Sequence, residues 1–144
     1  MENTKTLVEK LRQVCLEQPD FLQYTFLKNN TESKLTAREL DWQARCIAAS
    51  IAEYATLGER VILLYPSGLE FISALFGCFY TQVIAVPIYS HQFQASKLVE
   101  RLKTVLEDTG AKIILTLDEV VQNKNEYIEY DLTIILDFKI QHFL

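Results

Sequence analysis

Apolar and polar residues alternate along this chain in two patterns, one typical of helices and one typical of strands. Spacings of three and four residues, as on one face of a helix, occur within 7–15, 40–51, 71–79 and 98–106. Short apolar runs, typical of strands covered on both faces, occupy 61–65, 83–86, 112–116 and 133–137. Strands and helices in this order predict an α/β fold, a partial doubly wound and mostly parallel sheet with flanking helices.

Two further elements are expected outside this alternation. Residues 24–27 (YTFL) are typical of a strand, and Asn29 and Asn30 favour a tight turn, so a short N-terminal hairpin should return toward Leu35. A short helix is predicted over 117–125, because acidic residues stand at its start, where the helix dipole favours them. The chain ends soon after the fourth predicted strand, which is abrupt for a doubly wound domain, so we expect an incomplete sheet.

Polar residues at fixed spacing predict where two of the helices begin. Thr36 and Glu39 have the spacing of a capping box, in which each side chain satisfies a backbone N–H of the other residue. Ser67 and Glu70 have the same spacing, which predicts a second capping box. Gly110 stands where a glycine commonly ends a helix.

Composition limits the classes of protein to consider. The chain has 144 residues, of which 49% are hydrophobic and 23% charged, as expected for one globular domain with a single core. The formal net charge is -5 and the basic residues are scattered, which argues against nucleic-acid binding, since that needs a basic face.

Cysteine use and hydropathy bear on the compartment. Cys15, Cys46 and Cys78 lie widely spaced in helical patterns, so we expect buried, reduced thiols. The N-terminal residues lack the apolar core of a signal peptide, which predicts a cytoplasmic location. Residues 71–90 carry no charge and approach the length of a membrane span, but a buried helix followed by a buried strand explains them better.

Candidate chemistry is sparse. No two of the chain's four glycines lie close enough for a glycine-rich phosphate loop. His91 and His142 have no cysteine or carboxylate at metal-ligand spacing. Because ligands of open α/β sheets bind at the carboxyl ends of the strands, Tyr65, Ser67 and Tyr89 are the candidate rim of a crevice. Ser67 does not stand in a G-x-S-x-G nucleophile motif, which favours a capping role.

Three segments in a fixed order carry a family resemblance. They are residues 35–40 (LTAREL), 58–72 (GERVILLYPSGLEFI) and 76–87 (FGCFYTQVIAVP). They are similar to the blocks L-T-Y-x-E-L, G-E-R-x-L-L-x-Y-P-x-G-L-x-F and F-G-C-x-Y-A-G-x-x-A-V-P. The chain therefore resembles the start of the acyl-adenylate-forming, AMP-binding enzymes, and most closely the fatty-acyl-AMP ligases.

This resemblance implies ATP-dependent adenylation of a fatty acid with magnesium, release of pyrophosphate, and passage of the acyl group to an acyl carrier protein. The family's phosphate-binding loop, its residues around adenine and ribose, and its mobile C-terminal domain come later in family members and have no matching position here. No catalytic, cofactor-binding or metal-binding residue is therefore carried over. Gln82 stands where the family usually has glycine, and it would strain a turn that needs a positive φ.

Two hypotheses follow. The first is that residues 1–144 are a single truncated N-terminal subdomain of an AMP-binding domain, inactive alone because the phosphate loop and C-terminal domain are absent. The alternative is a non-catalytic binding or assembly module that pairs with a separately encoded remainder of the ligase. The weakest hypothesis is a membrane-associated protein that uses the uncharged residues 71–90.

Overall fold

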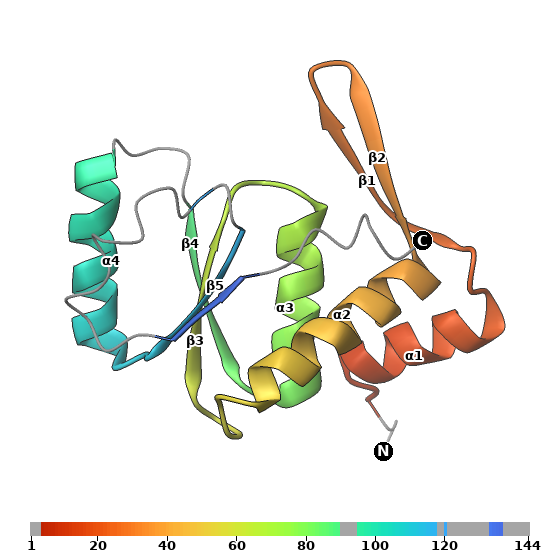
Figure 1. Cartoon of the computed structure of the whole chain (residues 1–144). Helices are drawn as coiled ribbons and strands as arrows, with labels where there is room; N and C mark the ends of the chain where they lie inside the picture. The colour runs from red at the N-terminus through yellow and green to blue at the C-terminus, as the bar shows by residue number, and fades with distance from the viewer. Residues whose placement is uncertain (1–3, 90–94, 118–119, 121–132, 137–144) are drawn as a thin grey trace.

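A four-stranded parallel sheet organises the chain (Figure 1). The computed structural model describes residues 4–89, 95–117, 120 and 133–136. The strands lie in the order β4-β3-β5-β6, and their bounds are Arg60–Tyr65 (β3), Ile84–Tyr89 (β4), Ile113–Thr116 (β5) and Thr133–Leu136 (β6). All three strand pairs are parallel, which confirms the α/β prediction.

The described residues also form four helices, namely α1 (Leu7–Glu17), α2 (Ala37–Ala52), α3 (Leu69–Thr81) and α4 (Ala95–Thr109). Figure 1 shows α4 on one face of the sheet, α2 and α3 on the other, and α1 beside α2. The helices predicted from apolar spacing are thus confirmed. The helix expected over 117–125 lies almost wholly outside the described residues.

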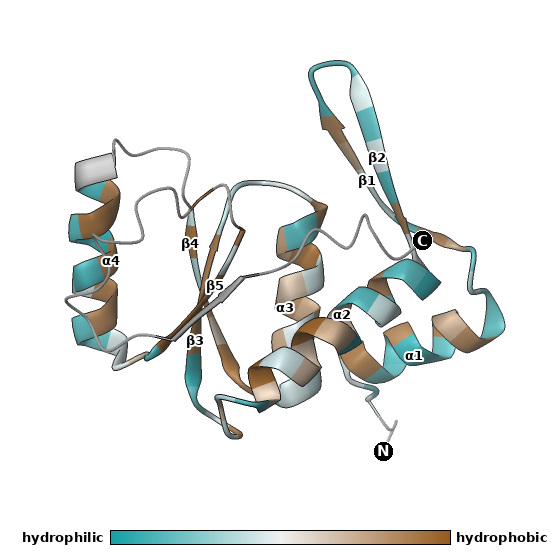
Figure 2. Ribbon diagram, in the orientation of Figure 1, coloured by the Kyte–Doolittle hydropathy of each residue, from teal (hydrophilic) through white to brown (hydrophobic). Residues whose placement is uncertain are grey.

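Alternation along β3 divides the core between the two faces of the sheet. Val61, Leu63 and Tyr65 pack with α2 and α3, whereas Ile62 and Leu64 pack with α4. All five are at most 2% exposed, as an unbroken apolar strand in a parallel sheet requires. Strand β3 is coloured brown, as hydrophobic, over most of its length in Figure 2.

The predicted hairpin is present and extends away from the sheet (Figure 1). It consists of β1 (Leu22–Lys28) and β2 (Thr31–Thr36), which pair antiparallel. Asn29 and Asn30 have φ angles of 49° and 60°, as a two-residue turn of type I′ requires, and asparagine tolerates this left-handed region. Leu35 at the base of the hairpin is buried against Leu11 and Leu40.

One predicted capping box is confirmed and the other is wrong. The Thr36 side chain accepts from the Glu39 N–H at 3.3 Å, and the Glu39 carboxylate accepts from the Thr36 N–H at 2.8 Å. At α3, however, the chain places Gly68 at the cap, and no side chain makes the capping bond. Helix α3 therefore begins one residue later than the spacing of Ser67 and Glu70 predicts.

The prediction that the second strand is covered on both faces is also wrong. Strand β4 lies at the edge of the sheet, where Ile84 is 48% and Tyr89 44% exposed. The strand also runs beyond the predicted residue 86 and includes Pro87. A proline is tolerated within an edge strand because its missing N–H falls on the side without a neighbour.

The cysteines differ in burial. Cys78 is fully buried, and burial raises the pKa of its thiol to about 12, so it stays protonated at neutral pH. Cys15 is half-buried and Cys46 is exposed, which corrects the expectation of three buried thiols, since Cys46 lies off the apolar stripe of α2. All three are free thiols.

The length and polarity of the helices bear on membrane insertion. In the part of the chain that the structure describes, every helix is too short or too polar to span a bilayer.

Replacement of Gln82 by glycine should stabilise the fold. Gln82 ends α3 with φ 57° and ψ 32°, and its N–H bonds to the carbonyls of Cys78 and Phe79. Because a residue with a Cβ is disfavoured there, we expect Gln82→Gly to raise the free energy of unfolding by about 1 kcal/mol. Urea denaturation followed by circular dichroism measures this change. Asn30→Gly, at a φ of 60°, is the control and should gain less because asparagine already tolerates it. Equal gains would contradict the explanation.

Candidate functional site

The carboxyl edge of the sheet brings two of the three predicted rim residues together. Tyr65 and Tyr89 end β3 and β4 and are direct partners in the parallel register. Tyr65 is 2% exposed, whereas Tyr89 is 44% exposed and Ser67 lies on the exposed turn before α3. Tyr89 and Ser67 are thus accessible at this edge, and Tyr65 forms its buried floor.

Thr116 fixes the neighbouring strand at the same edge. It is fully buried at the end of β5, and its hydroxyl donates to the Leu64 carbonyl at 2.7 Å. A buried hydroxyl needs such a partner, because an unpaired one would lose its hydrogen bonds to water without compensation. Thr116 is therefore a structural link between β3 and β5 and is not a free nucleophile.

A second polar cluster lies among the helices, and sequence reasoning missed it. Asp41 of α2 is only 4% exposed. Its Oδ2 lies 2.6 Å from Nη1 of Arg12 and 3.9 Å from Nη1 of Arg45, while its Oδ1 accepts from the Tyr80 hydroxyl. The cluster thus joins α1, α2 and α3 through one carboxylate.

The ionisation of this cluster follows from its geometry. The charge of Asp41 raises the pKa of the Arg12 guanidinium. Burial raises the pKa of the Tyr80 hydroxyl, and its hydrogen bond to Asp41 adds to that shift. Both groups therefore hold their protons firmly at neutral pH. Neither group therefore serves as a proton acceptor near neutral pH. We interpret the cluster as a clamp that holds the three helices together.

One sequence signal could have revealed Asp41. It stands four residues after Ala37 and three before Ala44, so it lies on the apolar stripe of α2. A carboxylate on a buried stripe requires a partner. The identity of that partner, however, depends on how α1 and α3 pack on α2, and that packing is not written in local spacing.

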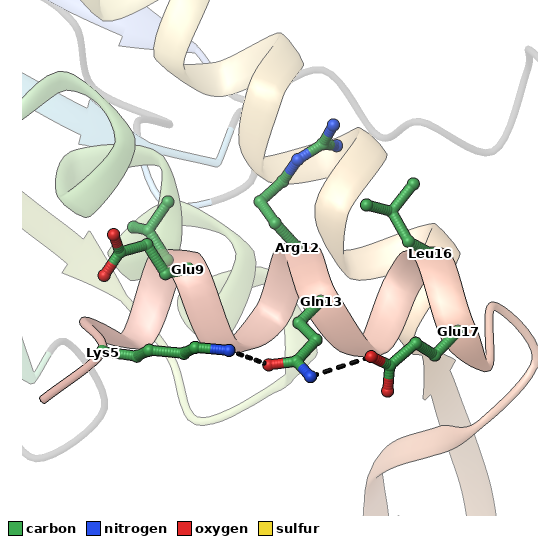
Figure 3. Close-up of a pocket in the computed structure, with 7 residues that line it drawn as sticks. Lys5, Glu9, Arg12, Gln13, Leu16 and Glu17 are labelled. Carbon is green, nitrogen blue, oxygen red and sulfur yellow. Dashed lines mark hydrogen bonds between the residues drawn. The ribbon is translucent and has the colours of Figure 1, made fainter. Parts of the chain in front are cut away.

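The hollow in Figure 3 lies along one face of α1. Three of its polar side chains bond to one another: Lys5 Nζ donates to Gln13 Oε1 at 2.6 Å, and Gln13 Nε2 donates to Glu17 Oε1 at 2.8 Å. Figure 3 shows Arg12 directed away from them, toward α2. Lys5 and residues of α1 line the hollow, with charges of both signs, so we interpret it as a solvated helix face.

The acidic, histidine and cysteine side chains of the described residues lie apart from one another. Within those residues, no three histidine, cysteine, aspartate or glutamate side chains gather closely enough to hold a metal ion. Magnesium prefers carboxylate oxygens, and the buried carboxylate of Asp41 is already bound to Arg12 and Tyr80. His91 and His142 lie outside the described residues.

Comparison with known proteins identifies the family. The family described as AMP-binding enzyme matches residues 11–140. The chain therefore belongs to the AMP-binding enzymes, as the three sequence blocks indicate.

Within this family, the chain is similar to fatty-acid ligases. It is 39% identical over 114 residues to the medium-chain-fatty-acid–[acyl-carrier-protein] ligase JamA of Moorena producens, covering 77% of this chain and 19% of that protein. It is 34% identical over 116 residues to the long-chain-fatty-acid–AMP ligase FadD26 of Mycobacterium tuberculosis, covering 77% of this chain and 20% of the relative. The chain thus spans about a fifth of the length of these relatives.

A solved enzyme shows the same architecture. The fatty acyl-adenylate ligase from Legionella pneumophila, in complex with acyl adenylate and pyrophosphate, matches with a TM-score of 0.81 and 31% identity. The match covers 96% of this chain and 24% of that one. The fold also matches the N-terminal subdomain of Klebsiella oxytoca NpsA, with a TM-score of 0.69 over 93% of this chain at 18% identity. The chain therefore resembles an N-terminal segment of a fatty-acyl-AMP ligase.

Proposed function

We propose that residues 1–144 form one N-terminal subdomain of a fatty-acyl-AMP ligase, and that this subdomain supports ATP-dependent activation of a fatty acid only together with the remaining parts of such an enzyme. The observation that carries the proposal is the match to AMP-binding enzymes over residues 11–140 by a chain spanning about a fifth of its relatives. Use of ATP fits the cytoplasmic location that the sequence predicts.

Adenylation needs groups that this segment does not bring together. Charge develops on the phosphates of ATP during the transfer, and enzymes stabilise it with placed hydrogen-bond donors and magnesium. The four glycines of this chain are too widely spaced for a phosphate loop. We therefore infer that ATP and magnesium are held by the remaining parts of the ligase, and that Tyr89 and Ser67 at most border their site. An acyl carrier protein is the proposed acceptor, by analogy with the relative JamA.

The proposal is tested by ATP–pyrophosphate exchange with the purified chain and a series of fatty acids. We expect no exchange above the buffer control, because under this proposal the donors that hold the phosphates belong to the remaining parts of the ligase. The Legionella pneumophila ligase, assayed in parallel, serves as the positive control. Fatty-acid-dependent exchange by the 144-residue chain alone would overturn the proposal.

A second candidate function is a non-catalytic assembly module that pairs with a separately encoded remainder of a ligase. Several large apolar side chains of the hairpin region are exposed, including Phe21 at 52% and Leu27 at 69%. Exposed apolar groups of this kind favour association. Co-purification of a polypeptide that carries the phosphate loop supports this function, whereas a chain that stays monomeric in the presence of such a polypeptide contradicts it.

A further inference from the structure

The strand edges of this fold differ in their capacity to accept another strand. Among the strands whose side chains the structure describes, three have an edge without a neighbouring strand in the described residues: β4, β1 and β2. An open edge offers backbone N–H and C=O groups to a further strand unless proline or charged residues obstruct it. The three edges can therefore be compared residue by residue.

The edge of β4 is obstructed by proline. The Ile84 N–H donates to the Glu59 carbonyl at 2.8 Å, so it points toward β3. Because successive residues of a strand point in opposite directions, the backbone groups of Ala85, Pro87 and Tyr89 face outward. Pro87 has no N–H to offer at the middle of this edge, which interrupts any added ladder.

The edge of β2 is obstructed by charge. Its residues Thr31, Glu32, Ser33 and Lys34 are polar and exposed. Glu32 and Lys34 form an ion pair at 3.3 Å with both side chains 57% exposed. Charged side chains along an edge disfavour strand addition, because an added strand would desolvate them.

The edge of β1 has no proline, and its one charged residue, Lys28, stands at the turn end of the strand. In a hairpin closed by a two-residue turn, the residues flanking the turn bond to each other and alternate residues point outward. Lys28 pairs with Thr31 in this way, so the backbone groups of Thr25 and Leu27 face away from β2. Tyr24 on one face is 37% exposed, and Leu27 on the other is 69% exposed. A strand with apolar side chains on both faces is typical of the interior of a sheet.

We propose that the outer edge of β1 is the docking surface for an extended strand from the remaining polypeptide of the ligase. This rests on the proposed function, in which the chain works only with that remainder. The occupant follows from the match to the Legionella ligase, in which about three quarters of the solved chain lies outside the region that this chain covers. Main-chain hydrogen bonds to Thr25 and Leu27 give affinity, and apolar side chains over Tyr24 and Leu27 give selectivity.

Hydrogen exchange tests this surface in a chimera, in which the 144-residue chain replaces the matching segment of the Legionella ligase. We expect the amides of Thr25 and Leu27 to exchange at least about tenfold more slowly in the chimera than in the isolated chain. The outward amides of Glu32 and Lys34 on β2 are internal controls and should not change. Equal rates for the β1 amides in both proteins, or protection on β2 instead, would overturn the proposal.

Matched proline substitutions give a second readout. Leu27→Pro and Glu32→Pro each remove one outward N–H at directly opposed positions of the hairpin. In the isolated chain their effects on the thermal midpoint should be similar, whereas in the chimera Leu27→Pro should lower the midpoint more. Should the chimera not fold, the isolated chain is mixed with Legionella polypeptide lacking the matching segment. Binding should then weaken at least about tenfold for Leu27→Pro alone, and equal weakening by both prolines, or no binding, overturns the proposal.

Two outcomes separate this surface from its alternatives. If the isolated chain forms a dimer that Leu27→Pro abolishes, the occupant is a second copy and the proposal is wrong. Pyrophosphate exchange by the chimera tests the proposed function independently. An active chimera without protection at Thr25 and Leu27 overturns only the docking surface, and a protected but inactive chimera overturns only the proposed function.

Discussion

Gly77→Ala should destabilise the chain by about 2 kcal/mol, within the range for overpacked cores. Gly77 lies on α3 where it meets α2. A Cβ added there would lie 2.6 Å from Cγ2 of Ile47, 3.0 Å from Cβ of Ile47 and 3.3 Å from the backbone oxygen of Ala44. Ile47 is only 5% exposed and belongs to the core, so its side chain has little room to move. The clash outweighs the gain in helix propensity of about 1 kcal/mol that alanine brings.

A double-mutant cycle with Ile47 identifies the cause. Ile47→Ala removes Cγ2 and makes room for the new methyl group. The loss of unfolding free energy in the double mutant should therefore be smaller than the sum of the two single losses by at least about 1 kcal/mol. Ile47→Val keeps a methyl group at the Cγ2 position and should give almost no rescue. Free energies of unfolding from urea titrations decide the matter. Additive effects with alanine at both positions would contradict the clash.

Local sequence patterns predicted the elements of this fold because those patterns determine local structure. Thr36 and Glu39 need no distant residue to cap α2, and Asn29 and Asn30 form their turn with their own backbone angles. The apolar run of β3 predicted its burial on both faces. The parallel sheet followed from the order of the elements, since a strand–helix–strand crossover favours parallel pairing.

The failures arose where the outcome depends on neighbours distant in sequence. The run 83–86 is as apolar as that of β3, but β4 lies at the edge of the sheet, and strand order decides this burial. Ser67 has capping-box spacing, yet the turn after β3 places Gly68 at the start of α3. The cluster around Asp41 joins residues 29 and 39 positions apart, which no spacing rule relates. The predicted rim of Tyr65, Ser67 and Tyr89 stays a prediction, although the register of Tyr65 and Tyr89 agrees with it.

Removal of the Asp41 carboxylate should have the largest effect of any polar substitution in the described part of the chain. We expect Asp41→Ala to lower the free energy of unfolding by about 3 kcal/mol, at the low end of the range for broken buried ion pairs. The carboxylate is 6% exposed, but the side chain of Arg12 is 41% exposed and regains water when its partner is lost. The hydroxyl of Tyr80 also loses its acceptor. Urea denaturation measures the total change.

Graded substitutions divide this effect between the partners. Asp41→Asn keeps an oxygen for the Tyr80 hydroxyl and removes the charge that binds Arg12, so it should cost about 2 kcal/mol. Tyr80→Phe removes only the hydroxyl and should cost about 1 kcal/mol. The matched control is Asp20→Asn. Oδ1 of Asp20 lies 3.2 Å from Nη2 of Arg38, and the side chains of Asp20 and Arg38 are 84% and 62% exposed. An exposed ion pair adds little to the free energy of unfolding, so this control should lower it by less than about 0.5 kcal/mol.

The part of the fold in which hydrogen exchange becomes faster distinguishes a clamp on α1 from a general loss of stability. Arg12 is the link from α1 to this cluster, while Leu11 holds α1 through apolar packing alone. Asp41→Asn should therefore speed hydrogen exchange in α1 more than in the strands β3 and β5, because α1 can detach without unfolding the sheet. Tyr80→Phe, which leaves the Arg12 pair intact, should not show this local effect. If all helices and strands lose protection together in Asp41→Asn, the carboxylate stabilises the fold as a whole and α1 is not specifically held by it.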